Sequence, residues 1–203
     1  MEFRWHQISG GEAFAEPFLP CPCSLRERAT EFLFSRGWSA GRPLIVIHPG
    51  SGGARKCWGK ERFHGLMQML RAAIDPFIIL LSGPADDRLR DWAEVTAGDD
   101  AAIIHLSGAD LPTVFSLLGS CDLYIGNDSG VSHLAGLAGC KVISIFGPTD
   151  PALWRPRGRA VKVIAPEADC APCAGSASCN DRQCLSGISL ERVLREALTF
   201  QLK

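Results

Sequence analysis

Short runs of consecutive apolar residues, each followed by a helix-like pattern, constrain the fold of this chain more than any other feature. Residues 44–47 (LIVI) are fully apolar, as in a strand that is buried on both faces. Further strands are predicted at residues 77–81, 103–104, 121–125, 141–146 and 161–164. Helices are predicted around residues 63–70, at residues 85–96, after a cap at Asp110, at residues 129–138 and from about Ser189. This alternation predicts an α/β fold, a Rossmann-like parallel sheet with helices on both faces.

The first part of the chain reads differently from the rest. Residues 1–41 are predicted to be an N-terminal tail or linker with one helix, and residues 42–203 a Rossmann-like domain. We expect the early helix to begin at Ser24, which has capping-box spacing to Glu27, and to end before Gly37.

Composition excludes several classes of function. The 203 residues are 46% apolar and 21% charged with a formal net charge of -1, which gives no electrostatic reason to expect a nucleic-acid partner. We see no apolar stretch that would span a bilayer and no secretory signal, so we infer a cytoplasmic protein. The nine cysteines are then better explained by buried thiols or a metal site than by disulfides.

Two glycine-rich loops follow predicted strands and should therefore lie on the same edge of the sheet, where ligands of such sheets bind. The first, HPGSGGARKCW, spans residues 48–58 and combines small residues with the charges of Arg55 and Lys56, as an anion site would. Known phosphate motifs fail here, because Arg55 replaces the third glycine of a dinucleotide fingerprint and Glu61 follows Lys60 where a P-loop needs Ser or Thr. The alternative is a tight loop whose lysine is merely solvated.

The second loop, GNDSGVSH at residues 126–133, opens a helix. The N–H groups and the positive end of the helix dipole would face a bound anion. Asp128 would repel a diphosphate, so we expect it to face sugar hydroxyls or the helix N–H groups. The alternative is that Asp128 or Ser129 caps the helix and His133 is a core histidine.

Two later segments also stand out. Residues 146–151 (FGPTDP) and 154–156 (WRP) predict rigid turns, and a purely structural loop explains them equally well. The late cysteines have spacing that would suit a structural, tetrahedral zinc, with free thiols as the alternative: Cys170, Cys173, Cys179 and Cys184.

Taken in order, these motifs resemble those of the ADP-heptose:lipopolysaccharide heptosyltransferases, glycosyltransferase family 9. The family shows Asp-(Ser/Thr)-Gly-x-x-His, then Phe-Gly-x-Thr-(Asp/Ser)-Pro and Trp-x-Pro, all of which occur within residues 126–158. Its His-Pro-Gly loop and Lys-x-Trp element match residues 48–58, and the likeness extends over about residues 42–198.

The resemblance implies the C-terminal, donor-binding half of a GT-B glycosyltransferase that inverts configuration and requires no metal or other cofactor for its chemistry. It implies an ADP-heptose-like donor, a role in lipopolysaccharide or related glycan synthesis, and a peripheral position at the inner face of the inner membrane. By position, the donor-binding residues would be Ser51 and Lys56 at the diphosphate, Ser129 and Gly130 as N–H donors, Asp128 at the sugar, His133 in support and Asp86 at the ribose.

The family's acceptor domain carries the general base, and residues 1–41 are too few to form that domain. We therefore assign no catalytic residue, and we expect the acceptor domain to be a partner, whether it was separated from this chain or is another subunit. Apolar residues of the last helix or of the cleft-facing edge would then be exposed, which predicts self-association. A stand-alone module that binds a nucleotide or sugar phosphate without transfer is the alternative function. A Rossmann oxidoreductase is disfavoured by Arg55.

Overall fold

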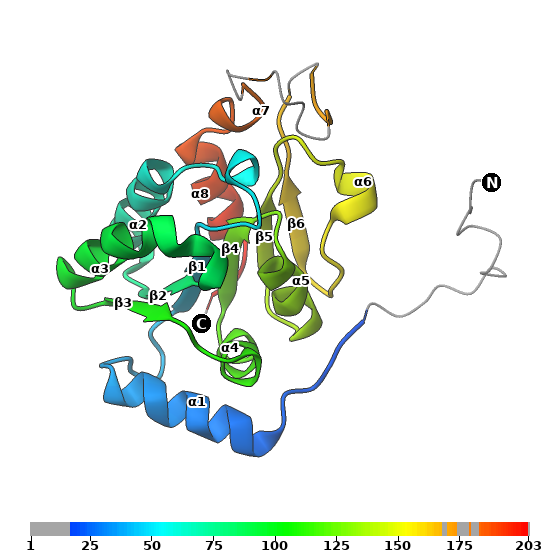
Figure 1. Cartoon of the computed structure of the whole chain (residues 1–203). Coiled ribbons are helices and arrows are strands. Elements are labelled where there is room, and N and C mark those ends of the chain that lie inside the picture. Colours follow the sequence, from blue (N-terminus) through cyan, green and yellow to red (C-terminus); the bar gives the residue numbers. More distant parts are fainter. Residues whose placement is uncertain (1–16, 168–169, 174–178, 180–182, 203) are drawn as a thin grey trace, which may run out of the picture.

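The computed structural model describes residues 17–167, 170–173, 179 and 183–202. Its centre is one parallel sheet with the strand order β3-β2-β1-β4-β5-β6 (Figure 1). The strands are β1 (Leu44–His48), β2 (Phe77–Ser82), β3 (Ile103–Ser107), β4 (Leu123–Asn127), β5 (Val142–Ile145) and β6 (Val161–Ile164). The predicted α/β fold is therefore confirmed, and all six predicted strands are present.

Helices cover both faces of the sheet, because the side chains of each strand alternate between them. The first face carries α2 (Lys60–Ile74), α3 (Arg90–Gly98) and α8 (Leu190–Leu198), whose buried residues share a core with Ile45 and Ile47 of β1. The second carries α1 (Cys23–Ser35), α4 (Leu111–Leu118) and α5 (Gly130–Leu137), whose buried residues meet Leu44 and Val46. The shorter elements are η2 (Ala54–Lys56), η3 (Pro84–Leu89), α6 (Pro151–Trp154) and α7 (Gln183–Ser186).

The helix predicted within residues 1–41 forms, but it does not start as expected. It begins at Cys23 after Pro22, and no side chain caps it, so the predicted Ser24 capping box is wrong. Gly37 has a φ of +90°, the left-handed conformation that favours glycine after a helix end. The helix packs onto α4 and buries Leu33 completely, so it contributes to the core of the domain.

The helix predicted at residues 85–96 is in fact two elements. A 3-10 helix, η3, precedes α3, and Asp86 departs from helical geometry with φ -110° and ψ 19°. The reason is local: the Asp86 carboxylate turns back to accept a hydrogen bond from the backbone N–H of Gly83 at 2.9 Å. This turn directs Asp86 to the carboxyl edge of the sheet.

Exposed apolar residues lie mainly outside the last helix. Most apolar residues of α8 pack on the core. Leu198, which is 44% exposed, is the large apolar side chain of this helix that reaches solvent. The carboxyl edge instead exposes Leu111 (73%), Leu153 (76%) and Trp154 (58%), as expected for the cleft-facing edge. Within the described residues, no helix is both long and apolar enough to cross a membrane.

The strand order reverses between β1 and β4, which lie side by side in the middle of the sheet. At such a switch point the loops that follow the two strands turn to opposite faces and leave a crevice between them, where ligands of these folds bind. The two glycine-rich loops follow β1 and β4 at this point.

Candidate functional site

Three loops that are far apart in the sequence meet at the Asp128 carboxylate. Lys56 Nζ lies 2.8 Å from Asp128 Oδ2, and Thr149 donates its hydroxyl hydrogen to the same oxygen at 2.7 Å. The Ser51 hydroxyl donates to the backbone carbonyl of Asp128 at 2.8 Å. The side chain of Asp128 is 7% exposed and that of Lys56 is 38% exposed, so the carboxylate of this pair is buried while the lysine is accessible to solvent. The structure thus brings together the loops after β1, β4 and β5.

A buried amide fixes the first loop to the second. Asn127 is fully buried, and its Oδ1 accepts from the backbone N–H of Trp58 at 3.0 Å. Its Nδ2 donates to the carbonyls of Pro49 at 2.7 Å and Gly50 at 3.1 Å. Asn127 therefore holds both ends of the loop that carries Lys56.

The tryptophan of the Lys-x-Trp element has a structural position. Trp58 is 4% exposed, meets Phe63 edge to face and donates its indole N–H to the carbonyl of Ile188 at 3.0 Å. It anchors the loop between α7 and α8 and does not line the cavity.

The N-terminus of α5 opens onto this site. Ser129 has an extended backbone at the N-cap position, and its own N–H is taken by Ser132 Oγ at 3.2 Å. A side chain added at Gly130 would meet nothing within 4 Å, so the first turn faces open space. N–H groups of a first helical turn have no partner within the helix and attract anions.

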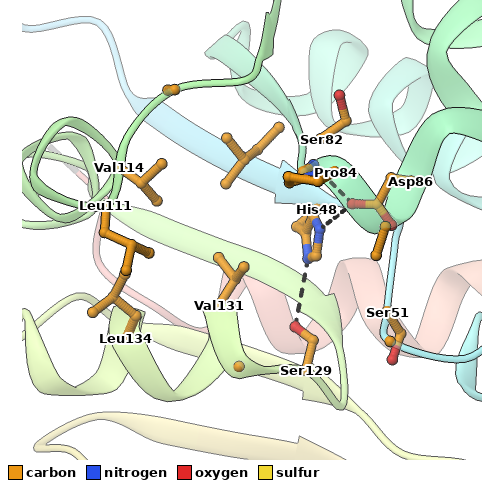
Figure 2. Close-up of a pocket in the computed structure, with 16 residues that line it drawn as sticks. His48, Ser51, Ser82, Pro84, Asp86, Leu111, Val114, Ser129, Val131 and Leu134 are labelled. Carbon is orange, nitrogen blue, oxygen red and sulfur yellow. Dashed lines mark hydrogen bonds and ion pairs between the residues drawn. The ribbon is translucent and has the colours of Figure 1, made fainter.

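A cavity of about 430 Å³ lies beside this helix end. Figure 2 shows apolar side chains along one side of it, from Leu111 and Val114 of α4 and from Val131 and Leu134 of α5. The other side is polar and presents His48, Ser51, Asp86 and Ser129. Such a division suits a ligand with a flat apolar end and an anionic end.

His48 and Asp86 form a buried pair in the polar wall. His48 Nε2 lies 3.0 Å from Asp86 Oδ2, and both side chains are 5% exposed or less. Burial acts to raise the pKa of Asp86, but hydrogen bonds from His48 and Gly83 and the charges of His48 and Arg88 outweigh it and hold this pKa below its usual value. Asp86 is therefore a carboxylate at neutral pH.

Asp86 reaches the cavity wall, but its carboxylate already has partners, and its contact with a ribose stays a prediction. It lines the cavity, but the whole residue is 3% exposed and its Oδ2 already accepts from His48 and Gly83. Its Oδ1 is buried against Gly50, where an added Cβ would lie only 1.8 Å away. This geometry does not favour a direct contact of Asp86 with a ribose.

The remaining predicted site residues lie outside this cluster. His133 is exposed on α5 and does not line the cavity, so the alternative of a core histidine is wrong. Burial, and then electrostatic interactions with Cys173, Cys170 and Cys179, raise the pKa of Cys184, so these four thiols lie in one neighbourhood. Among the described residues, however, no three His, Cys, Asp or Glu side chains are placed to hold a metal ion. Zinc at these cysteines stays a prediction.

Three residues of the site were not singled out from the sequence: His48, Asn127 and Thr149. His48 and Asn127 are the last residues of β1 and β4, the strands at the switch point, whereas Thr149 lies in the turn after β5. Because all three make their contacts with residues at least 21 positions away, a local pattern could not assign their partners.

The fold and the site define a doubly wound α/β protein with a ligand-sized cavity at the switch point of its sheet. Residues 15–183 match the model of glycosyltransferase family 9 (heptosyltransferase), and the chain belongs to this family. It is 32% identical over 118 residues to lipopolysaccharide heptosyltransferase 3 of Escherichia coli, an alignment that covers 57% of this chain and 34% of that relative.

Solved structures agree on the fold. The glycosyltransferase of family 9 from Veillonella parvula matches with a TM-score of 0.77 at 23% identity, over 90% of this chain and 53% of that one. E. coli ADP-heptose LPS heptosyltransferase II matches with a TM-score of 0.71 at 20% identity, over 91% and 53%. E. coli heptosyltransferase WaaC with ADP matches with 0.64 at 22% identity, over 84% and 48%. The chain thus spans about half of these structures and about a third of the curated relative.

Proposed function

We propose that this chain binds the nucleotide-sugar donor of a heptosyltransferase-like, inverting glycosyltransferase whose chemistry needs no metal. The observation that carries the proposal is the meeting of Lys56, Asp128 and Thr149 beside the open N-terminus of α5 and the two-sided cavity. A nucleoside would lie in the cavity, its diphosphate over the helix end, and the sugar toward Asp128. One solved relative carries ADP, which makes an ADP-sugar the first donor to test.

The apolar wall supports the nucleoside end of this assignment. A base buried between α4 and α5 would remove apolar surface from water at about 25 cal/mol per Å². The polar wall then receives the phosphates, for which Gly130 offers its N–H and Ser129, whose N–H is taken by Ser132, offers its hydroxyl. Ser51 already donates its hydroxyl to the Asp128 carbonyl, so it holds the loop and approaches the phosphates through its backbone.

Lys56 explains how a leaving diphosphate could be stabilised without a cation. When the bond from sugar to phosphate breaks, negative charge grows on the diphosphate, and a fixed positive group stabilises it. Lys56 is held by Asp128 at 2.8 Å, yet its side chain is 38% exposed and can contact a phosphate as well. Asp128 in turn keeps Oδ1 clear of this ion pair for a sugar hydroxyl. We assign no general base, because in the family that residue belongs to the acceptor domain.

Calorimetry with ADP and ADP-heptose tests the proposal. The wild-type chain should bind both ligands. Lys56→Ala should lower the affinity for ADP by about tenfold, which is the effect of losing one charge-assisted contact. Lys141→Ala is the matched control, since Lys141 precedes β5 at the opposite edge of the sheet and contacts the Gln201 carbonyl. Absence of ADP binding at millimolar concentration would refute the assignment.

The partners follow from the same proposal. An acceptor domain added in trans should restore transfer, whereas binding without any restored transfer would favour a stand-alone nucleotide module. We propose self-association through the exposed Leu153 and Trp154 of α6. Leu153→Glu should then lower the sedimentation coefficient at high concentration, and a wild type that is monomeric throughout would contradict this. A cytoplasmic location at the inner face of the inner membrane is a proposal that rests on the family alone.

A further inference from the structure

His48 is an ionisable residue in the wall of the cavity, and neither the motifs nor the family match gives it a role. It is 4% exposed and joins two elements that are otherwise separate, η3 through Asp86 and α5 through Ser129 (Figure 2). Its Nε2 lies 3.0 Å from Asp86 Oδ2, and its Nδ1 lies 3.4 Å from Ser129 Oγ. Asp86, His48 and Ser129 therefore form one chain of hydrogen bonds that ends at the helix N-terminus.

The protonation state of His48 decides which way this chain runs. Asp86 is a carboxylate, so Nε2 of His48 must carry a hydrogen. In a neutral imidazole Nδ1 then has a lone pair and accepts the hydrogen of the Ser129 hydroxyl. Ser129 Oγ would turn only lone pairs toward the cavity, which disfavours an anion.

An imidazolium reverses the second bond. Nδ1–H donates to Ser129 Oγ, and the Ser129 hydrogen becomes free to donate to a phosphate oxygen. The positive charge lies between the Asp86 carboxylate and the bound anion, and both favour it. No rearrangement of the backbone is needed.

Other charges around His48 do not replace this effect. On η3, Arg88 lies beyond Asp86 and acts on that carboxylate. Lys56 of η2 and Asp128 after β4 neutralise each other as an ion pair. The phenol of Tyr124 in β4 is fully buried, and burial raises its pKa, so it stays neutral.

We propose that His48 takes up a proton from solvent when a nucleoside diphosphate binds, and that the Ser129 hydroxyl then donates to a phosphate. This inference rests on the proposed function, since it assumes that the phosphates lie at the start of α5. His48 is then a positioning residue whose action depends on pH, and it acts on the recognition of a phosphate.

The test is calorimetry of ADP binding at one pH in two buffers of different ionisation enthalpy, PIPES and Tris. The wild type should take up more protons than His48→Gln, which keeps a donor to Asp86 but cannot be protonated. ADP's own protonation contributes equally to both and cancels. Between pH 6.5 and 8.5 the wild-type affinity should fall more steeply than that of the variant, by up to about tenfold per pH unit.

Two further variants make the outcome decisive. His64→Gln, on α2 where His64 contacts Gln68, should leave proton uptake at the wild-type value. Asp86→Asn should lose the extra uptake, and it carries the test if His48→Gln does not fold. ADP binding that is sensitive to Lys56→Ala, but with equal proton uptake in wild type and His48→Gln, overturns this inference alone. No ADP binding by the wild type overturns the proposed function and this inference together.

Discussion

Replacing Asn127 with aspartate should destabilise the fold and loosen the loop that carries Lys56. The substitution keeps the size of the side chain and keeps Oδ1, which accepts from the Trp58 N–H at 3.0 Å. It replaces the Nδ2 donor, however, with an oxygen that would face the carbonyls of Pro49 and Gly50, now 2.7 and 3.1 Å from Nδ2.

The expected cost follows from burial. Asn127 is 0% exposed, so neither the new oxygen nor the two carbonyls gains water in place of the lost bonds. Each buried polar group left without its partner costs about 1–3 kcal/mol, and we expect a total of about 3 kcal/mol. For a chain of this size that corresponds to a fall in melting temperature of about 6–12 °C. At pH 5 the loss should be smaller, because a protonated carboxyl group can donate to one of the carbonyls.

Urea unfolding at pH 7.5 measures the effect. Gln68→Glu is the matched control: it also turns an amide into an acid, but Gln68 is exposed on α2, and such surface changes stay within about 0.5 kcal/mol. ADP affinity should fall in Asn127→Asp at a temperature where the variant is still folded, because Lys56 loses its fixed position. A loss of less than about 1 kcal/mol would refute the view that Asn127 ties the two loops together.

Gly50→Ala should cost about 1–3 kcal/mol and weaken ADP binding, because the new Cβ would lie 1.8 Å from Asp86 Oδ1; an unchanged melting temperature would count against this close packing. The pKa of Asp86 is lower in the folded state than its unfolded value of about 3.9, so its contribution to stability is full above about pH 4 and is lost as the pH falls through the lowered pKa. Urea unfolding from pH 5 to 3 should therefore show a shallower decline in Asp86→Asn, and equal slopes would contradict the pair. Asp128→Asn should bind ADP at least as tightly as the wild type, since a negative charge near the phosphates is removed, but lose the added affinity for ADP-heptose; an equal loss for both ligands would show that Asp128 acts only through Lys56.

Much of the fold could be predicted because it depends on local patterns. The apolar run of β1 and the helical spacing on α2 are visible in the sequence, and right-handed crossovers then place both glycine-rich loops on one edge. The start of α1 could not be predicted, since Ser24 and Glu27 have the spacing of a cap but the chain enters the helix through Pro22. The break at Asp86 was equally invisible, because the spacing does not show that the Asp86 carboxylate turns back to the Gly83 N–H and also meets His48, 38 residues earlier.

The site was predictable as a set of motifs but not as a set of contacts. The motifs assign Lys56 and Asp128 to the donor from separate loops, and no sequence pattern indicates that the two side chains face each other. That pairing changes the electrostatics of the site. An isolated lysine at a helix N-terminus would add to the positive potential of the dipole, whereas a lysine paired with a buried carboxylate nearly cancels its own charge at a distance.

In the function that we propose, this cancellation suits a site that binds a charged donor and releases a charged product. If Lys56 were unpaired, it would strengthen ADP and ADP-sugar binding alike, and tight binding of the product would slow turnover. With Asp128 as its partner, Lys56 presents a smaller net positive charge, so the breaking bond and the ADP product are both stabilised less than by an unpaired lysine. Thr149 donates to the same carboxylate oxygen and so helps to hold Asp128 in place. The contact between the loops after β4 and β5 is therefore part of the chemistry that we propose. Because this contact joins two separate loops, the pattern of one glycine-rich loop could not predict it.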